Sequence, residues 1–380
     1  MSSQSVAAVY KLVKAPIYSH CFSQDKSLLA VTCKNDCLVY RLGNGPAPQL
    51  VATLSNHDKT VTAVDISIHG RILTCSQDRN AYVWEPLSDG TYKPTLVLLR
   101  INRAATCVSW APNGYKFAVG SSARIIAVCY YEQENNWWVS KHIKKPIKST
   151  IQCLSWHANG VLLASGGTDG FMRIFSGFIK GLDTKESVAG SPWGEKFPFG
   201  SLIREFYHGS YIEDVQWRSS IEKVGYVSHE GALTVVDYAN NHAKVNSPDG
   251  LPFNALLWIN DHEILCAGFS NHPVLFAESG ANQWQFAKDV DKVAASPSNP
   301  IASGNEDLDE SEDANGNGTF GMSALRKFKQ LDLKGKVSTD VNETAHENTI
   351  TELLPYAEAN GQVSKVSACG LDGKVVIYNI

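Results

Sequence analysis

The chain has 380 residues, of which 43% are hydrophobic and 19% are charged, and its net charge at pH 7 is −4. A weakly acidic chain has no overall attraction to nucleic acid or to anionic lipid, so any basic surface for a partner must be local. The opening MSSQSVAAVYKLVKAP has no charged leader before an apolar core, and no later stretch stays apolar over the roughly 20 residues of a membrane span, which predicts a soluble protein that keeps its N-terminus, without nucleic acid or membrane insertion.

One unit of three short strands recurs along the chain. The second copy reads VTAVDISIHGRILTCSQDRNAYVWE and the fourth reads IQCLSWHANGVLLASGGTDGFMRIFSG. The copies begin at Ile17, Val61, Ala105, Ile151, Ile212, Phe253 and Ile350. Their first strands end in anchor residues that lie 44 to 46 positions apart in the first four copies: Phe22, Ile66, Trp110 and Trp156. This spacing matches a four-stranded propeller blade and is too short for a βαβ unit with a full helix.

A fourth strand follows the second, third and sixth copies, at 90–99, 135–143 and 282–290. The last copy ends at Ile380 without one, whereas the N-terminal VAAVYKLV has no blade before it. We therefore expect the N-terminal strand to complete the last blade, which closes the ring and removes a sheet edge. The predicted fold is an all-β, seven-bladed propeller formed by residues 1–380 as a single domain.

Nine cysteines form no CxxC pair, and most of them stand among Val, Leu and Ala in strand-like runs. This pattern indicates small buried hydrophobic residues in a reducing compartment rather than disulfides or zinc ligands. We accordingly expect no metal site.

The second copy carries a polar set at fixed offsets, whose members are His57, Thr74 or Ser76, Asp78 and Trp84. The set resembles the structural tetrad of WD repeats, in which Asp accepts from the His ring, His meets a hydroxyl, and the hydroxyl meets the Trp ring nitrogen. A second, partial set in the last copy consists of His346, Asp372 and Tyr378, and His208 has the same offset in the fifth copy.

A His, a Ser and an Asp also invite a catalytic interpretation. A hydrolase would need its serine on an exposed, strained turn beside an oxyanion hole, but the hydroxyl here lies inside a strand pattern. The set also recurs in more than one blade, whereas a catalytic site is needed once. We interpret it as structural and predict no catalytic residue.

Two insertions interrupt the repeat, at 177–201 and at 292–346. The first contains Trp193, Phe197 and Phe199, which can pack on the rim or on a partner. The second begins with an acidic flexible linker, including the run 306–313, and continues into a predicted amphipathic helix at about 322–333. The helix has apolar residues at helical spacing with cations between them: Met322, Leu325, Arg326, Lys327, Phe328 and Leu331.

Just before this helix, Gly316, Gly318 and Gly321 spell the dinucleotide fingerprint GxGxxG. No strand leads into it, and the carboxylates before it would repel a pyrophosphate, so a linker is the better interpretation and no cofactor is expected. A helix this short is marginal in water when isolated, which favours ordering on contact with a partner.

The run TCSQDRNAYVWE, the following stretch TLVLLRINRAATCVSWAPNGYKFAVGSSARIIAVCYYE and the insert FGMSALRKFKQLDLKG together resemble the WD-repeat subunits of the actin-related protein 2/3 complex. The similarity extends over the whole chain and indicates a fungal member. The acidic run before the helix and the incomplete tetrads depart from the family pattern.

The resemblance implies a non-catalytic structural and regulatory subunit that supports nucleation of branched actin filaments, with no ATP site. It implies as partners two actin-related proteins, four smaller subunits, the actin filament and the acidic tails of Wiskott-Aldrich-type activators. It associates the insert helix with actin, and it implies a location in the cytoplasm and cytoskeleton, at cortical actin patches that act in endocytosis.

Two other interpretations of the sequence stay open. The first is a propeller adaptor such as a substrate receptor of a cullin ubiquitin ligase, although such receptors usually carry WDxR at blade ends where this chain has VWEP, VCYY and VVDY. The second is a propeller hydrolase, which would need an exposed activated residue or a metal in the central channel.

Overall fold

The computed structural model describes residues 5–43, 47–184, 190–194, 198–280, 282–291, 344–359 and 361–380. The chain divides into two units, Met1–Asp291 with Ala345–Ile380, and Lys292–Thr344. In the first unit the described residues form seven four-stranded antiparallel sheets. The only helix among the described residues is the short 3₁₀ turn Ser219–Ile221, and none of them forms a helix that is long and apolar enough to cross a membrane.

Each sheet is one blade, whose strands follow one another from the inner to the outer edge. Blade 1 consists of β2 (His20–Phe22), β3 (Leu28–Cys33), β4 (Asp36–Arg41) and β5 (Gln49–Leu54). Blade 2 consists of β6 (Val61–Ile66), β7 (Ile72–Ser76), β8 (Ala81–Pro86) and β9 (Tyr92–Val97). Blade 3 consists of β10 (Ala105–Trp110), β11 (Lys116–Ser121), β12 (Ile126–Glu132) and β13 (Trp137–Ile143). Blade 4 consists of β14 (Ile151–Trp156), β15 (Leu162–Gly167), β16 (Phe171–Ser176) and β17 (Leu202–Tyr207).

Blade 5 consists of β18 (Ile212–Arg218), β19 (Lys223–Ser228), β20 (Ala232–Asp237) and β21 (His242–Asn246). Blade 6 consists of β22 (Phe253–Asn260), β23 (Glu263–Gly268), β24 (Val274–Gly280) and β25 (Gln283–Asp289). Blade 7 consists of β26 (Ile350–Ala359), β27 (Gln362–Gly370), β28 (Lys374–Asn379) and, from the other end of the chain, β1 (Val6–Lys11). The seven blades confirm the seven predicted copies.

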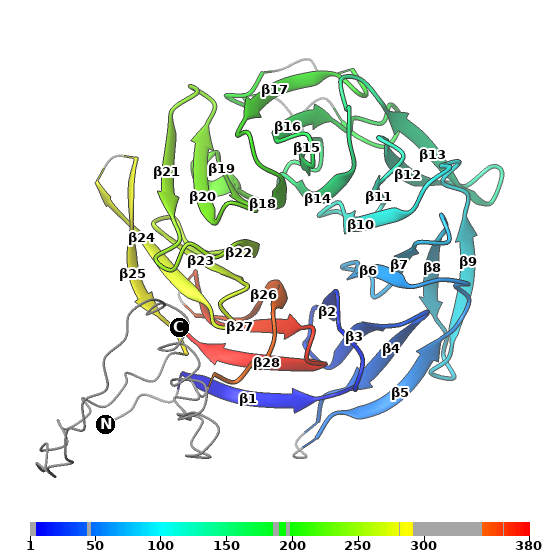
Figure 1. The fold of residues 1–380 in the computed structure, drawn as a ribbon. Coiled ribbons are helices and arrows are strands. Elements are labelled where there is room, and N and C mark those ends of the chain that lie inside the picture. The colour runs from blue at the N-terminus through cyan, green and yellow to red at the C-terminus, as the bar shows by residue number, and fades with distance from the viewer. Residues whose placement is uncertain are drawn as a thin grey trace, which may run out of the picture. The chain divides into compact units, whose positions relative to one another are not determined.

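The two ends of the chain meet in blade 7. Strand β1 pairs antiparallel with β28, and Val9 lies opposite Val376 (Figure 1). The prediction that the N-terminal strand completes the last blade is therefore confirmed. Because the first and last strands share one sheet, the ring cannot open without breaking a strand pair.

The ring has two faces that carry different sets of loops, because the strands within every blade are antiparallel. Connections between blades and turns between second and third strands lie at one end, which we call the interblade face. Turns between first and second strands and between third and fourth strands lie at the other end, which we call the opposite face.

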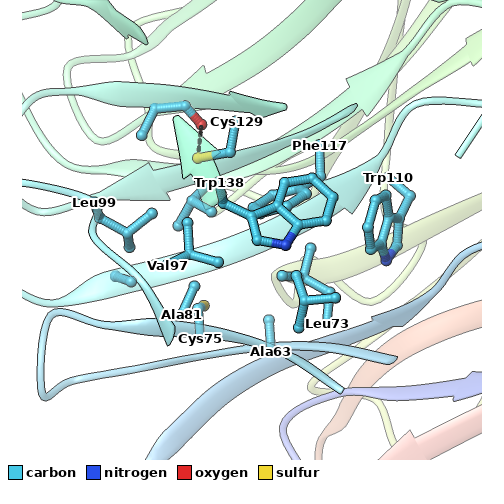
Figure 2. Close-up of a cluster of buried hydrophobic side chains, with 14 residues drawn as sticks. Ala63, Leu73, Cys75, Ala81, Val97, Leu99, Trp110, Phe117, Cys129 and Trp138 are labelled. Carbon is cyan, nitrogen blue, oxygen red and sulfur yellow. Dashed lines mark hydrogen bonds between the residues drawn. The ribbon is translucent and has the colours of Figure 1, made fainter. Parts of the chain in front are cut away.

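Seven apolar clusters hold the ring together, one between each pair of neighbouring blades. The cluster between blades 2 and 3 is representative: Leu73 from blade 2 faces Trp110, Phe117 and Trp138 from blade 3 (Figure 2). Trp110 and Phe117 meet edge to face, with ring centroids 4.9 Å apart. Truncating a buried aromatic residue of this size to alanine typically costs about 3–5 kcal/mol.

Side-chain hydrogen bonds join the inner strands around the channel. In six inner strands the second residue forms a β-bulge, and these residues are Thr62, Thr106, Gln152, Glu213, Asn254 and Thr351. A bulge turns its side chain out of the regular ladder. The Thr62 hydroxyl donates to the carbonyl of Ala105 in the next blade over 3.1 Å, and the Thr351 hydroxyl donates to that of Ile17 over 2.8 Å.

Half-buried carboxylates that line the channel make further bonds of this kind between blades. Asp65 accepts the backbone N–H of Trp110 at 2.7 Å, and Asp214 accepts that of Leu256 at 2.9 Å. Burial raises the pKa of Asp65 to about 6 and that of Asp214 to about 7, although these N–H donors favour the charged form.

The insertion at 177–201 is anchored to the ring on the opposite face. The fully buried Lys116 forms an ion pair with Asp183, and its ammonium group also donates to the carbonyl of Gly177 over 2.9 Å. Trp193 is buried against Trp217, with ring centroids 5.3 Å apart, and its indole N–H donates to Glu222 over 2.9 Å. The insertion therefore packs on the rim of its own ring. Phe199 contributes a cation–π contact with Lys141, and Phe197 lies outside the described residues.

Replacing Asp183 with alanine should lower the free energy of unfolding by about 3–5 kcal/mol, because it leaves the buried Lys116 ammonium without its counter-charge. Chemical denaturation of the full chain measures the change. The double variant Lys116→Met/Asp183→Ala removes both charges and should recover most of the loss. Equal destabilisation in the single and double variants would contradict the electrostatic explanation.

The raised pKa of Asp214 should make stability depend on pH. An unfolded aspartate titrates near 3.9, so between about pH 4 and pH 7 the folded chain holds a proton that the unfolded chain has lost. The free energy of unfolding of the wild type, relative to that of Asp214→Asn, should fall as the pH rises through this window and level off above it. Denaturation of both proteins at several pH values tests the sign; a relative stability that rises with pH would refute the assignment.

Candidate functional site

The polar set of blade 2 forms a continuous chain of hydrogen bonds below the interblade face. Nδ1 of His57 lies 2.8 Å from Oδ2 of Asp78, and Nε2 of His57 lies 2.9 Å from the hydroxyl of Thr74. The same hydroxyl accepts the indole N–H of Trp84 over 3.0 Å. Thr74 is thus the hydroxyl member of the set. Ser76, the alternative, takes no part in this chain and instead donates to the carbonyl of Lys59 over 2.8 Å.

Asp78 connects two loops of the interblade face. Its carboxylate accepts the backbone N–H of Asp58 at 3.0 Å, in the connection from blade 1, and that of Asn80 at 2.8 Å, in the turn between β7 and β8. Burial lowers the pKa of His57, although the adjacent Asp78 raises it. A buried imidazole between a carboxylate and a hydroxyl therefore acts as a structural link that fixes how these loops present their outer residues.

The second set, in blade 7, differs from the first at the tryptophan position. His346 still pairs with Asp372, with Nδ1 3.1 Å from Oδ2. Tyr378 stands where blade 2 has its tryptophan, and its hydroxyl donates to Asp291 over 3.3 Å. The other bond of Asp291 is to the backbone N–H of Ala345, at 2.7 Å. Asp291 therefore joins the two ring segments that flank residues 292–343.

In blade 5, Nε2 of His208 lies 2.8 Å from a carboxylate oxygen of Glu230, so a glutamate takes the place of the aspartate. Sequence reasoning identified His208 by its offset but found neither Glu230 nor Asp291. The only signal for Glu230 was its position next to the tight-turn Gly231, and Asp291 lies outside the repeating pattern.

Exposed cations gather in the interblade-face loops of blades 1 to 4. We call them the basic surface, which comprises Lys34, Lys59, Arg79, Arg100, Arg103, Arg124, Lys144, Lys145 and Lys148. The described ion pairs of the chain involve other lysines and arginines, so none of these nine has an acidic partner within the described residues. The loops that carry them are fully described and contain one exposed acid, Asp58.

The interblade face is asymmetric in charge. The corresponding described loops of blades 5 and 6, residues 208–211, 229–231, 247–252 and 269–273, contain no lysine or arginine but expose Glu230 and Asp249. Opposite charges thus occupy different parts of one face, although the whole chain is nearly neutral. This distribution gives the interblade face of blades 1 to 4 a positive local field.

Four members of the basic surface have a left-handed, strained backbone conformation: Lys34, Arg79, Arg100 and Arg124. Arg79 and Arg124 have φ of +78° and +61° in the turns between second and third strands. Blades 4 and 7 place Gly170 and Gly373 at this point of the turn, where left-handed backbone carries no steric cost. A side chain in this conformation costs roughly 1 kcal/mol or more, so arginine at these positions lowers the stability of the ring.

The central channel is polar and contains a cavity of about 330 Å³. His20, Glu352 and Cys369 place potential ligand atoms within 4.8 Å of one another beside it. Both ring nitrogens of His20 already have protein partners, Glu352 at 3.0 Å and Ser367 at 2.8 Å. Burial raises the pKa of the Cys369 thiol well above its usual range, which disfavours the thiolate that metals bind. The group fits a link between blades 7 and 1 better than a metal site.

The residues predicted for the insert helix lie outside the described residues, and so does the GxGxxG stretch. These residues are Met322, Leu325, Arg326, Lys327, Phe328 and Leu331. The helix stays a prediction from the sequence.

Comparison with known proteins gives the family. The model for the WD domain, G-beta repeat, matches residues 48–85 and 140–176. The chain is 74% identical over 378 residues to actin-related protein 2/3 complex subunit 1 of Saccharomyces cerevisiae, covering 99% of this chain and 98% of that protein.

Two more distant relatives cover nearly the same length. Subunit 1 of Schizosaccharomyces pombe is 39% identical, covering 99% of this chain and 100% of that protein. Subunit 1A-B of Xenopus laevis is 36% identical, covering 98% and 96%. These full-length matches decide against the ubiquitin-ligase adaptor and the hydrolase, and the high identity to the budding yeast protein confirms a fungal member. The chain belongs to the family of actin-related protein 2/3 complex subunit 1, as a structural WD-repeat subunit rather than an enzyme.

Proposed function

We propose that the protein is a non-catalytic structural and regulatory subunit of the actin-related protein 2/3 complex that supports the nucleation of branched actin filaments. Its relatives are named as subunits of that complex. The regulatory part of the proposed function rests on the basic surface. Its nine exposed cations have no acidic partners among the described residues, and the loops that display them are held in place by a rigid ring.

The partners in this proposal are the two actin-related proteins and four smaller subunits of the complex, together with the acidic tails of Wiskott-Aldrich-type activators. Acidic tails match the basic surface in charge, and complementary charge speeds association and selects partners. The left-handed Arg79 and Arg124 support this role, because an energetic cost in a turn persists only when something else favours the residue.

The insert helix is proposed to bind the actin filament. The support is its amphipathic pattern in the sequence, with Leu325, Phe328 and Leu331 on one side and cations between them. An amphipathic helix of this kind lays its apolar side into a partner's groove. The proposed location is the cytoplasm and cytoskeleton, at cortical actin patches.

Reversing two charges of the basic surface tests the proposal for acidic tails. In the assembled complex, Arg79→Glu/Arg124→Glu should weaken binding of an acidic activator peptide by at least about tenfold, and the loss should shrink at high salt because exposed charges are screened there. Fluorescence anisotropy with a labelled peptide measures the affinity. The double substitution Lys93→Glu/Arg204→Glu changes the net charge equally on outer strands and should have little effect; equal losses in both variants would refute a specific site.

Replacing Leu325, Phe328 and Leu331 together with serine tests the helix. Branching by the purified complex should fall, because the apolar contact with actin is lost, while assembly of the complex should stay intact. Microscopy of filament branching and gel filtration measure the two properties. A control with Met at the same three positions keeps the apolar character and should branch normally. Unchanged branching by the serine variant would remove the helix from the proposed function.

A further inference from the structure

The outer strand of each blade is a sheet edge. The inner strands face the channel, where side chains of neighbouring blades bond some of their backbone groups. Each outer strand lies at the periphery of the ring (Figure 1), and no strand of this chain pairs with its outer side among the described residues. Such an edge can pair with a strand of another chain, and natural proteins guard against this with charged residues or proline.

Six of the seven outer strands in the described ring carry such a guard. The guarding residues are Lys11 on β1, Lys93 and Pro94 on β9, Lys141 on β13, Arg204 and Glu205 on β17, Lys244 on β21, and Lys288 and Asp289 on β25. Strand β5 alone, with the sequence QLVATL, has neither a charged residue nor a proline. This absence singles out one edge among seven that are otherwise built alike.

The side chains of β5 suit strand pairing. Leu50 is 49% exposed, and Gln49 and Thr53 are exposed as well. Val51 and Ala52 pack in the cluster between blades 1 and 2, so the strand is held firmly in its blade. Alternate residues of an antiparallel edge strand point their backbone groups outward, so about half of the six residues are available to an added strand.

We propose that β5 accepts an extended segment of another subunit of the complex as a fifth strand of blade 1. Backbone hydrogen bonds supply the affinity in this mode, and alternate side chains supply the specificity. The segment is uncharged over the strand, with an apolar residue against Leu50. It carries an acidic residue at the end near the exposed Arg41, which is paired with Gln49.

A second copy of this chain fits less well than another subunit. Strand β5 contains no acidic residue, so a β5 from a second copy would offer no counter-charge to Arg41. Because the relatives of this chain are named as subunits of a complex, we also expect other chains around this ring. This contact would lie on the side of the ring and does not depend on the roles proposed for the basic surface and the insert helix.

Hydrogen exchange measured by mass spectrometry tests the added strand directly. The outward-facing backbone amides of β5, which β4 does not pair, should exchange at least about tenfold more slowly in the assembled complex than in the isolated full-length chain, since an amide that pairs becomes protected. Amides of the guarded edge β9 should exchange alike in both. Equal exchange of β5 in the two states overturns the proposal, and so does protection that appears in the isolated chain and rises with its concentration, because that result indicates self-association.

A matched pair of substitutions separates β5 from a general effect of surface charge. Leu50→Lys guards the open edge, whereas Leu96→Lys makes the same change at a residue of similar exposure, 44%, on β9. We expect Leu50→Lys to lower the yield of co-purified complex by about tenfold or more, because a lysine would have to be desolvated in the interface. Leu96→Lys should leave the yield unchanged. Circular dichroism should show both variants folded, and an equal yield from both would overturn the proposal.

Discussion

Ring closure between blades 7 and 1 is the constraint on which the rest of this structure depends. The backbone N–H of His20 donates to Glu352 over 2.6 Å, the Thr351 hydroxyl donates to Ile17, and β1 completes the sheet that ends with β28. Each blade can bury its sides only against two neighbours, so a gap at one interface would expose apolar surface on both of its walls. Bonds at this junction therefore support all seven clusters.

A closed ring leaves the loops free to differ. On the opposite face, the buried pair of Lys116 and Asp183 holds the 177–201 insertion against the rim, where it adds to the core. On the interblade face, Asp78 and His57 fix the loops from below while Lys59 and Arg79 stay in water. Unpaired cations in strained turns cost stability locally, but the framework beneath does not depend on these loops.

The sequence predicted correctly the features whose residue pattern repeats along the chain. The spacing of 44 to 46 residues between anchors such as Trp110 predicted the blades, because each blade repeats the same burial pattern. It could not choose between Thr74 and Ser76, since both lie on one strand and only the direction of the side chain toward Trp84 separates them. It also missed Asp65 and Asp214, which accept backbone N–H groups from the next blade.

By itself the sequence determined the all-β class, the number of blades, the closing role of the N-terminal strand and the family, because these depend on local alternation, turn residues and a pattern repeated along the chain. Only the tertiary structure decided which loops combine into the basic surface, that Asp291 joins residues on either side of the long insertion, and that β5 is an open edge beside six guarded ones. These features depend on residues far apart in the chain, whose proximity follows from the geometry of the ring and leaves no periodic trace in the sequence.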